Sequence, residues 1–354
     1  MAETRALVKS LFSLTKPRVV VLLQITAMCA ILSHDLIETN KINQSTLEVM
    51  MIVFIGGYLT AGGANCINMW YDRDIDPIMT RTSKRPLSVG DITPKKALLF
   101  GILISIIGTL WLLKMANEVA AFWALFSILF YVFIYTIWLK RTSVQNIVIG
   151  GIAGSTPPVI GWAAAEDELE LEFSSAHDFI DSIVNIGGYM PWFMFLLIFL
   201  WTPPHFWALA LYRSGEYEKV GVPMMPNVKG KGRTLVEMKI YSILLILLSL
   251  TTPLAFQEKS NSIELSDLDF NISLAVINSL ILSIWYVLTV WKININDEND
   301  IMPTASHSFF VSLTYLAVMF IILVLTSINF IIKGSIVSTV LVLYIIFRKR
   351  GGKE

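Results

Sequence analysis

Residues 49–76 read VMMIVFIGGYLTAGGANCINMWYDRDID, and this stretch decides what kind of protein the chain is. No side chain from Val49 to Tyr71 is charged. A helix crosses the hydrocarbon of a bilayer with about 20 such residues. Three acidic residues follow within five positions. The stretch therefore predicts a membrane-spanning helix that ends in a charged group at the membrane surface.

The composition of the whole chain agrees with this interpretation. Of its 354 residues, 55% are hydrophobic and only 15% are charged, whereas about 25% are charged in a typical soluble domain. The formal net charge is zero, which gives no electrostatic attraction to nucleic acid. We expect an integral membrane protein that does not bind nucleic acid.

Hydrophobic stretches of spanning length recur along the chain, and lipid favours helices because it cannot satisfy the backbone of an open strand. The predicted spans are 18–34, 49–71, 97–115, 119–139, 144–164, 189–211, 238–256, 271–291 and 307–328. A shorter stretch, 335–347, would add a tenth. The predicted fold class is an all-α integral membrane bundle of nine or ten transmembrane helices, forming a single polytopic domain over residues 1–354.

The distribution of basic residues predicts a cytoplasmic N-terminus. With ten spans, all but four of the 27 Lys and Arg fall on the inner side; the four are Lys41, Lys114, Lys259 and Lys333. The loops 72–96 and 212–237 are then cytoplasmic. The acidic loop 165–188 lies outside, where we interpret its carboxylates as a solvated, variable loop rather than a cation site. Residues 333–354 form a C-terminal extension.

The two cytoplasmic loops are longer than a connection requires, and such loops often carry function. Asn68, Asp72 and Asp76 open the first, and their i, i+4, i+8 spacing places them on one helix face. Mg²⁺ prefers oxygen ligands, commonly one or two carboxylates plus substrate phosphates. We therefore predict that these side chains hold Mg²⁺. The alternative is a polar helix end that meets water, but ionisable groups at a span's edge are usually functional.

Basic side chains accompany the acidic group: Arg81, Lys84, Arg85 and Lys140. Positive-inside topology alone would place basic residues here. Beside carboxylates, they also supply what a leaving diphosphate requires, since Arg and Lys neutralise phosphate oxygens. We predict that these four residues bind a diphosphate.

A second candidate region surrounds His205, which follows the pair Pro203-Pro204 within a span. We expect the proline pair to break the helix there. A histidine inside a membrane is usually functional, and one satisfied by packing is the alternative. Steps of three or four residues lead from His205 to Leu209, from Leu209 to Tyr212 and Arg213, and from Arg213 to Glu216, and this spacing predicts one shared helix face. Arg213 and Glu216 could equally form an exposed ion pair.

A third stretch, from Gly150 to Gly161, is rich in small residues. Small side chains let membrane helices approach closely. The same face could instead leave room for a flat ligand.

Together these motifs resemble the UbiA-type intramembrane prenyltransferases. The Asn-x-x-x-Asp-x-x-x-Asp pattern at 68–76 marks that superfamily. Within it, six segments resemble the branch that farnesylates haem: Tyr71–Asp76, Arg81–Pro86, Leu139–Ser143, Pro157–Gly161, Pro204–Ala210 with Glu216-Tyr217, and Val222–Pro226. Many members carry a second Asp-x-x-x-Asp, whose place is taken here by Arg213 and Glu216.

The resemblance implies a UbiA-type bundle in a bacterial inner membrane. It implies transfer of farnesyl from farnesyl diphosphate to the 2-vinyl group of haem B, with Mg²⁺, to give haem O. In that reaction Asp72, Asp76 and His205 would be catalytic and Glu216 would be a further metal ligand. The residues implied to contact haem are His205, Trp207, Tyr212 and Arg213. Expected partners besides the substrates are membrane lipid and a haem A synthase or an assembly partner of a terminal oxidase.

Two other functions remain open from the sequence. One is prenylation of an aromatic quinone precursor, which the missing second acidic pair disfavours. The other is a non-enzymatic haem carrier or oxidase assembly factor. Such a carrier would use His205 but would not need the face formed by Asn68, Asp72 and Asp76.

Overall fold

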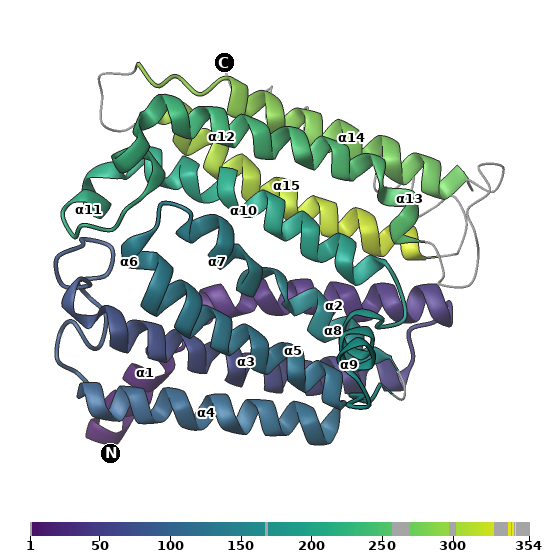
Figure 1. Ribbon diagram of the computed structural model, residues 1–354, viewed down its shortest axis with the longest axis horizontal. Coiled ribbons are helices and arrows are strands. Elements are labelled where there is room, and N and C mark those ends of the chain that lie inside the picture. Colours follow the sequence, from purple (N-terminus) through teal and green to yellow (C-terminus); the bar gives the residue numbers. More distant parts are fainter. Residues whose placement is uncertain are drawn as a thin grey trace.

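The computed structural model describes residues 2–166, 169–256, 270–296 and 302–328, together with 339, 340, 342 and 344. These residues form helices joined by loops, and none of them forms a β-strand. The helices lie side by side as a bundle (Figure 1). The all-α class predicted from the sequence is confirmed.

Eight segments of the described chain are long and apolar enough to cross a membrane. They are α2 (Pro17–Glu38), α3 with the short helix η1 (Gln44–Tyr71, Asp72–Asp74), α4 (Pro94–Met115), α5 with η2 and α6 (Glu118–Leu129, Phe130–Leu139, Lys140–Thr142), α7 with α8 (Asn146–Ser155, Pro157–Ala165), α10 (Met190–Tyr212), α14 (Phe270–Trp291) and α15 (Pro303–Ser327). A multi-pass membrane protein follows from these segments.

The other helices are α1 (Ala2–Leu14), α9 (Ala176–Val184), α11 (Ser214–Glu218), α12 (Met225–Leu250) and α13 (Thr252–Ala255). The predicted span 238–256 falls on α12 and α13. The helix α12 packs against α10 and α14 but is not among the eight apolar segments. Most of the predicted tenth span, 335–347, lies outside the described residues. The number of spans and the cytoplasmic N-terminus therefore remain predictions.

Two helices differ from what their sequences predict. The helix α10 runs without interruption through Pro203 and Pro204, so the expected break beside His205 is wrong. Neighbouring helices can satisfy the backbone groups that a membrane proline frees. The predicted span 119–139 is not a uniform α-helix, because its second half, η2, is a π-helix.

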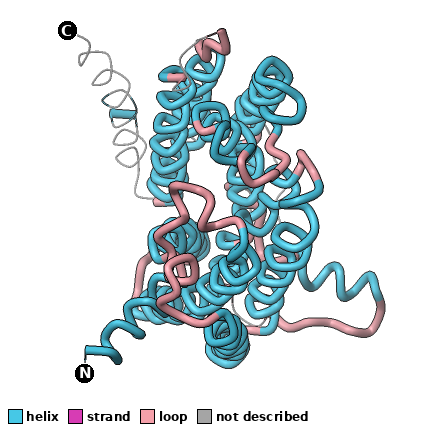
Figure 2. The backbone as a smooth tube through the Cα atoms, turned by 90° about the vertical axis from the view of Figure 1, so that its left-hand side faces the viewer, coloured by secondary structure: helices cyan, strands magenta, loops and turns pink. Residues whose placement is uncertain are grey.

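The bundle brings the long loops to one end. In Figure 1 the loop after η1, α6 and α11 all lie at the left end, and Figure 2 looks onto that end. A buried apolar cluster joins the two loops there; its members are Ile75, Ile147, Ala210, Val222 and Met224. The side chain of Asn146 adds a hydrogen bond to the carbonyl of Pro223 at 3.3 Å. The bundle thus brings two loops that are far apart in sequence into one assembly.

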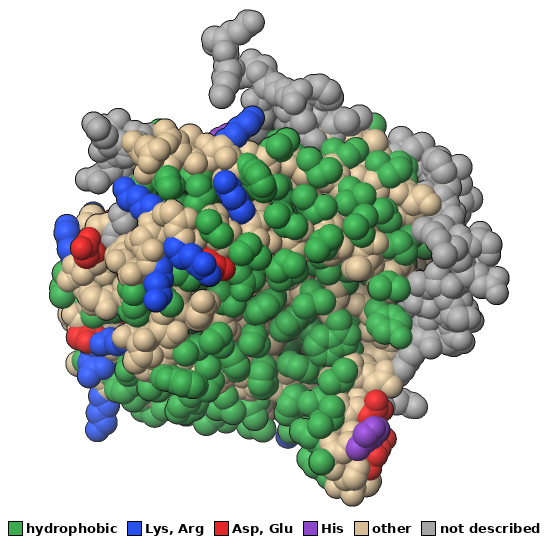
Figure 3. Space-filling model, turned by 45° about the horizontal axis from the view of Figure 1, so that its top comes forward, with side chains coloured by type: hydrophobic (Ala, Val, Ile, Leu, Met, Phe, Trp, Pro, Cys, Tyr) green, Lys and Arg blue, Asp and Glu red, His purple; other side chains and the backbone are tan. Residues whose placement is uncertain are grey.

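The outer surface is apolar around the middle of the bundle. Figure 3 shows hydrophobic side chains covering that region, with Lys and Arg gathered toward one end. Large side chains such as Phe133 and Trp138 are 56% and 60% exposed. Water would not favour such a surface, whereas lipid does.

Small residues bring α2 and α8 into close contact. A Cβ atom on Gly161 would lie 2.4 Å from the carbonyl oxygen of Ala27. The small-residue stretch therefore serves helix approach at this position.

The end of the bundle opposite the long loops is held by a buried histidine. His34 on α2 contacts Asp35 through Nδ1 and Glu166 through Nε2, both at 2.8 Å. Asp35 in turn accepts a hydrogen bond from Thr46 at the start of α3. This group ties α2, α3 and the end of α8 together.

Candidate active site

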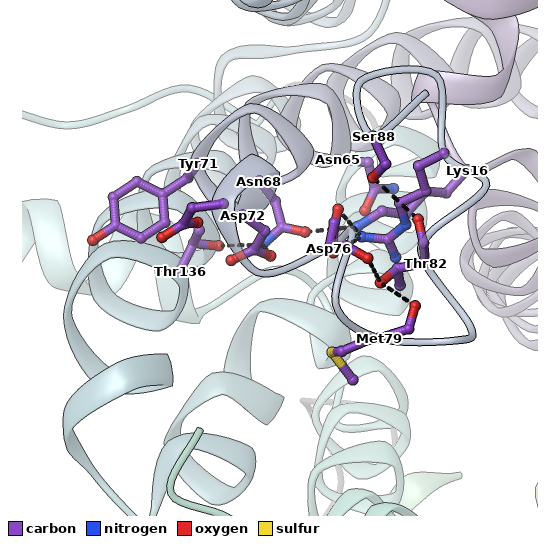
Figure 4. A network of polar contacts seen from close by, with 12 residues as sticks. Lys16, Asn65, Asn68, Tyr71, Asp72, Asp76, Met79, Thr82, Ser88 and Thr136 are labelled. Atoms are coloured by element: carbon purple, nitrogen blue, oxygen red, sulfur yellow. Dashed lines mark hydrogen bonds and ion pairs between the residues drawn. The ribbon is translucent and has the colours of Figure 1, made fainter. Parts of the chain in front are cut away.

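Asn68, Asp72 and Asp76 lie together where α3 ends (Figure 4). The helix continues to Tyr71, Asp72 caps it, and the amide of Asp76 donates to the carbonyl of Asp72 at 2.9 Å. The chain therefore keeps turning through all three residues. Asn68, Asp72 and Asp76 are only 3%, 0% and 2% exposed. They form a buried oxygen-rich group, which we call the acidic cluster.

Each member of the acidic cluster contacts a basic side chain from a different part of the chain. Lys16 Nζ donates to Asn68 Oδ1 at 2.7 Å. Lys140 Nζ pairs with Asp72 Oδ2. Arg85 Nη1 lies 2.8 and 2.7 Å from the two carboxylate oxygens of Asp76. Buried carboxylates require such partners, since an unpaired charge is costly away from water.

The carboxamide of Asn68 is fixed in one orientation. Its Nδ2 donates to Asp72 Oδ2 at 3.1 Å and to Thr136 Oγ1 at 3.0 Å. Both amide hydrogens are then used. The oxygen Oδ1 must face the other way, toward Lys16, where a cation can approach it.

One carboxylate oxygen of the acidic cluster has no hydrogen bond. Asp72 Oδ1 is buried, and the guanidinium of Arg141 comes no closer to it than 3.7 Å. Such a buried acceptor is unusual and fits a ligand that is added later. No three His, Cys, Asp or Glu side chains of the described residues group closely enough to form a metal site by themselves. Mg²⁺ usually takes one or two carboxylates and completes its shell with substrate phosphates.

Lys16 was not predicted as a site residue, because topology alone explained its charge. Loss of water on burial lowers its pKa to about 7, and the positive charges of Arg85 and Lys140 add to this effect. A lysine in such a setting is stabilised by an added anion. Its position beside Asn68 makes it a candidate for contact with a phosphate.

The four basic residues predicted to bind a diphosphate fall into two groups. Arg85 and Lys140 contact the acidic cluster directly. Arg81 and Lys84 are exposed in the loop that follows. Arg141, which was not predicted, instead forms a two-pronged ion pair with the exposed Asp74, with both distances 2.7 Å.

An aromatic pair from η2 lies beside the acidic cluster. The rings of Tyr131 and Tyr135 stack with their centroids 5.3 Å apart and their planes 24° apart. The hydroxyl of Tyr131 reaches Asn65 Oδ1, one turn before Asn68, at 3.5 Å. The faces of Trp70 and Tyr71, by contrast, are covered by Arg73 and Arg141.

His205 lies deep in the bundle and is 5% exposed. Its ring is sandwiched between Trp201 and Phe309, with centroid distances of 4.1 and 4.5 Å. Its Nδ1 lies 2.6 Å from Ser312 Oγ. The hydroxyl of Ser312 donates its only hydrogen to the carbonyl of Phe309, also at 2.6 Å.

These hydrogen bonds fix the tautomer of His205. Since Ser312 has no second hydrogen to give, His205 Nδ1 must be the donor. In the neutral ring Nε2 then carries the lone pair, and none of the hydrogen bonds among the described residues uses it. A histidine that ligates a metal typically donates its other ring N–H in this way.

The predicted single face from His205 to Glu216 is wrong beyond Tyr212. The helix α10 ends there, and Arg213 has the non-helical angles φ −125° and ψ 25°. Arg213 packs over the Tyr212 ring, 5.6 Å from its centroid, and meets Glu216 Oε1 at 3.3 Å. Glu216 is therefore paired with Arg213, not with a member of the acidic cluster. Trp207 is fully buried, with its ring edge-on to Tyr241.

Comparisons with curated proteins show which family this chain resembles. A model of the UbiA prenyltransferase family matches residues 28–314. The chain is 40% identical over 310 residues to a protoheme IX farnesyltransferase of Bartonella tribocorum, covering 87% of each chain. It is 45% identical over 247 residues to a protein of the same name from Symbiobacterium thermophilum, covering 69% of this chain and 74% of the other.

Solved structures share the fold at low identity. A digeranylgeranylglyceryl phosphate synthase aligns with a TM-score of 0.66 and 18% identity, covering 93% of this chain and 100% of that one. A UbiA homologue of Archaeoglobus fulgidus bound to GPP and Mg²⁺ aligns with a TM-score of 0.57 and 15% identity, covering 90% and 99%. These likenesses concern the arrangement of helices.

Proposed function

The chain belongs to the UbiA prenyltransferase family, and on that premise we propose that it transfers the farnesyl group of farnesyl diphosphate to the 2-vinyl group of haem B. The observation that carries this proposal is the buried acidic cluster with Lys16, Lys140 and Arg85 in contact with it. The names of the curated relatives support haem as the acceptor.

In the proposed reaction, the bond between farnesyl C1 and the diphosphate oxygen breaks, and its electron pair leaves with diphosphate. The terminal vinyl carbon bonds to C1, water adds to the inner vinyl carbon, and one proton is released. The products are haem O and diphosphate. The protein must hold the leaving group, keep stray water from the allylic cation and present the acceptor.

Asn68, Asp72 and Asp76 are the residues that would hold Mg²⁺, and Asp72 Oδ1 accepts no hydrogen bond that the ion would have to displace. The ion would neutralise charge on the departing diphosphate. The cations that now pair with the acidic cluster would turn to phosphate oxygens when substrate arrives. Arg81 and Lys84 are exposed on the adjoining loop and are proposed to close over the same group.

The stacked pair Tyr131 and Tyr135 is proposed to face the allylic cation. Ring faces attract cations, and the attraction grows where water is absent. Both rings belong to η2, which runs directly into Lys140 of α6, so the cation would form next to the leaving group. Trp70 and Tyr71 are poorer candidates because guanidinium groups already cover their faces.

His205 is proposed to act on the acceptor through Nε2. The lone pair that Ser312 leaves on this atom can bind the haem iron or take the proton from the attacking water. Trp207 and Tyr212 would line the haem site, and Arg213 would meet a propionate. Glu216 is retained only as a proposed second metal ligand, since it now pairs with Arg213.

We further propose that the site faces the cytoplasm from a bacterial inner membrane and that haem O passes to a haem A synthase or a terminal oxidase assembly partner. The excess of basic residues in the loops of the site supports this orientation. A non-enzymatic haem carrier is a poorer candidate, since it gives the acidic cluster no role.

The test uses purified protein in lipid with haem B, farnesyl diphosphate and Mg²⁺, followed by chromatography of the haem. We expect haem O from the unchanged protein and a loss of at least a hundredfold in Asp72→Asn. Asp74→Asn is the matched control, because Asp74 is a 57% exposed carboxylate two residues away, and it should stay near normal. Haem O production by Asp72→Asn at the rate of the control would overturn the proposal.

A further inference from the structure

The helix η2, which carries Thr136 and runs directly into Lys140 at the start of α6, has an unusual hydrogen-bond pattern. At its end the amide of Lys140 donates to the carbonyl of Tyr135, five residues back, instead of four. The ten residues Phe130–Leu139 form one π-helix. Most π-helices are single-turn bulges, and they occur often at functional sites. A π-helix of ten residues is therefore unusual, and its role follows from the contacts that it makes possible.

The π-helix aligns side chains of η2 with polar side chains along α3. Side chains along η2 and its C-cap residue Lys140 pair in order with side chains along α3 and its C-cap residue Asp72. Tyr131 pairs with Asn65, Thr136 with Asn68, and Lys140 with Asp72. From Asn65 to Asp72 is seven positions, which is about two turns of an α-helix. From Tyr131 to Lys140 is nine positions. Nine positions make about two turns only if each turn holds about 4.4 residues, as in a π-helix.

An α-helical η2 would lose this match. Nine α-helical positions make about two and a half turns, which would place Tyr131 and Lys140 on opposite faces. Thr136 would then be rotated away from Tyr131 by about 140°. The wider π turn instead keeps Tyr131, Thr136 and the following Lys140 on the side that meets α3 and Asp72.

A neighbouring glycine accommodates the widened helix. A Cβ atom on Gly150 of α7 would lie 2.3 Å from the ring of Tyr135. The ring therefore fits only because position 150 has no side chain. On the opposite side, Phe133 and Trp138 are exposed, so the π-helix presents its large apolar side chains outward.

Thr136 is the residue through which η2 acts on the acidic cluster. It is fully buried, and its hydroxyl accepts one amide hydrogen of Asn68 at 3.0 Å. Asp72 accepts the other. Without Thr136, the Asn68 carboxamide keeps its bonds to Asp72 and Lys16 but loses one of the two acceptors that hold its nitrogen, so its orientation is less firmly fixed.

We infer that the π-helix η2 sets the register of the diphosphate site and that Thr136 is a positioning residue, which orients Asn68 Oδ1 toward the incoming cation. This inference rests on the proposed function, since it assigns a purpose to the same site. It goes further in naming a residue that touches neither substrate nor metal. It also explains why a buried threonine occurs at position 136 in a helix of large apolar and aromatic residues.

The experiment compares three variants of the full chain in lipid discs: Thr136→Val, Thr136→Ser and Asp72→Asn. Valine keeps the shape of threonine but cannot accept a hydrogen bond, whereas serine can. Binding of farnesyl thiolodiphosphate, which resists ionisation, is measured by titration calorimetry with and without Mg²⁺. Thermal unfolding of each variant is recorded beside it, and Thr136→Ala replaces the valine variant if valine alone lowers the melting temperature.

We expect Mg²⁺-dependent binding to weaken at least about fivefold in Thr136→Val, the effect of leaving a buried amide hydrogen unpaired. Thr136→Ser should remain within twofold of the unchanged protein. In turnover, the KM for Mg²⁺ should rise more than kcat falls. Equal binding by the valine and unchanged proteins, or equal loss in valine and serine variants, would overturn the inference. If binding is indifferent to both Mg²⁺ and Asp72→Asn, the proposed function itself fails.

Discussion

Lys16 offers the clearest single test of how charge is arranged in this site. Its ammonium is buried and therefore has lost much of its water, and the charges of Arg85 and Lys140 repel it. It lies 2.7 Å from Asn68 Oδ1 and forms no direct ion pair with a carboxylate of the described residues. A phosphate oxygen would supply an anionic partner. Replacing Lys16 by methionine keeps the length of the side chain and removes the charge.

The size of the effect follows from the bond that would be lost. A hydrogen bond to a charged group contributes about 1.5–3 kcal/mol. Since each 1.36 kcal/mol is a factor of ten in rate, kcat/KM for farnesyl diphosphate should fall about 10- to 150-fold. Lys16→Arg keeps a positive charge and should retain more activity than Lys16→Met.

The assay is initial-rate formation of haem O at saturating Mg²⁺ and haem B, with farnesyl diphosphate varied. Lys95→Met is the matched control, because Lys95 is an exposed lysine in the first turn of α4. A rate for Lys16→Met within threefold of the Lys95→Met control would refute the reasoning that Lys16 meets the diphosphate.

Three further expectations concern Arg85, His34 and the metal. Arg85 contacts both carboxylate oxygens of Asp76 through one nitrogen, which a lysine could replace. Arg85→Lys should therefore keep activity within about tenfold, whereas Arg85→Gln should lose about a hundredfold, as measured by the rate of haem O formation. His34→Ala leaves Asp35 and Glu166 without their shared partner, which should lower the free energy of unfolding by about 3–5 kcal/mol. The melting temperature should fall while the acidic cluster stays intact, and an unchanged melting temperature would contradict this expectation. Chelation by EDTA should abolish turnover, and added Mg²⁺ should restore it, whereas activity that survives EDTA would argue against the metal.

Much of the fold follows from local sequence. The span from Val49 to Tyr71 could be predicted because a long uncharged run has few alternatives to a membrane helix. The grouping of Asn68, Asp72 and Asp76 could be predicted because their spacing follows the α-helical repeat and the chain keeps turning past Tyr71.

Other parts of the site could not be predicted, and the reasons are physical. Thr136 and Tyr131 were missed because α-helical periodicity places Tyr131 opposite Lys140, and nothing local in the aromatic run indicates a π turn. Lys16 was missed because a basic residue before a first span satisfies the topology rule without any site. These residues acquire their roles only when α2, α3 and η2 pack together.

For the region from His205 to Glu216, local sequence patterns predicted features that the structure does not have. The spacing from His205 to Glu216 suggested one continuous face, yet α10 ends at Tyr212 and Arg213 turns out of the helix. The proline pair suggested a break that membrane packing instead absorbs. Both expectations came from local rules, and the structure follows neither of them.

The central claim is that the acidic cluster holds a metal-bound diphosphate. The most direct measurement is an experimental structure of the protein with farnesyl thiolodiphosphate and Mn²⁺, using the anomalous signal of the metal. We predict a metal peak within coordinating distance of Asp72 Oδ1 and Asp76, with Lys16 and Lys140 turned from the acidic cluster to phosphate oxygens. A diphosphate bound elsewhere, with Lys140 still paired to Asp72 and no metal at the acidic cluster, would contradict the account.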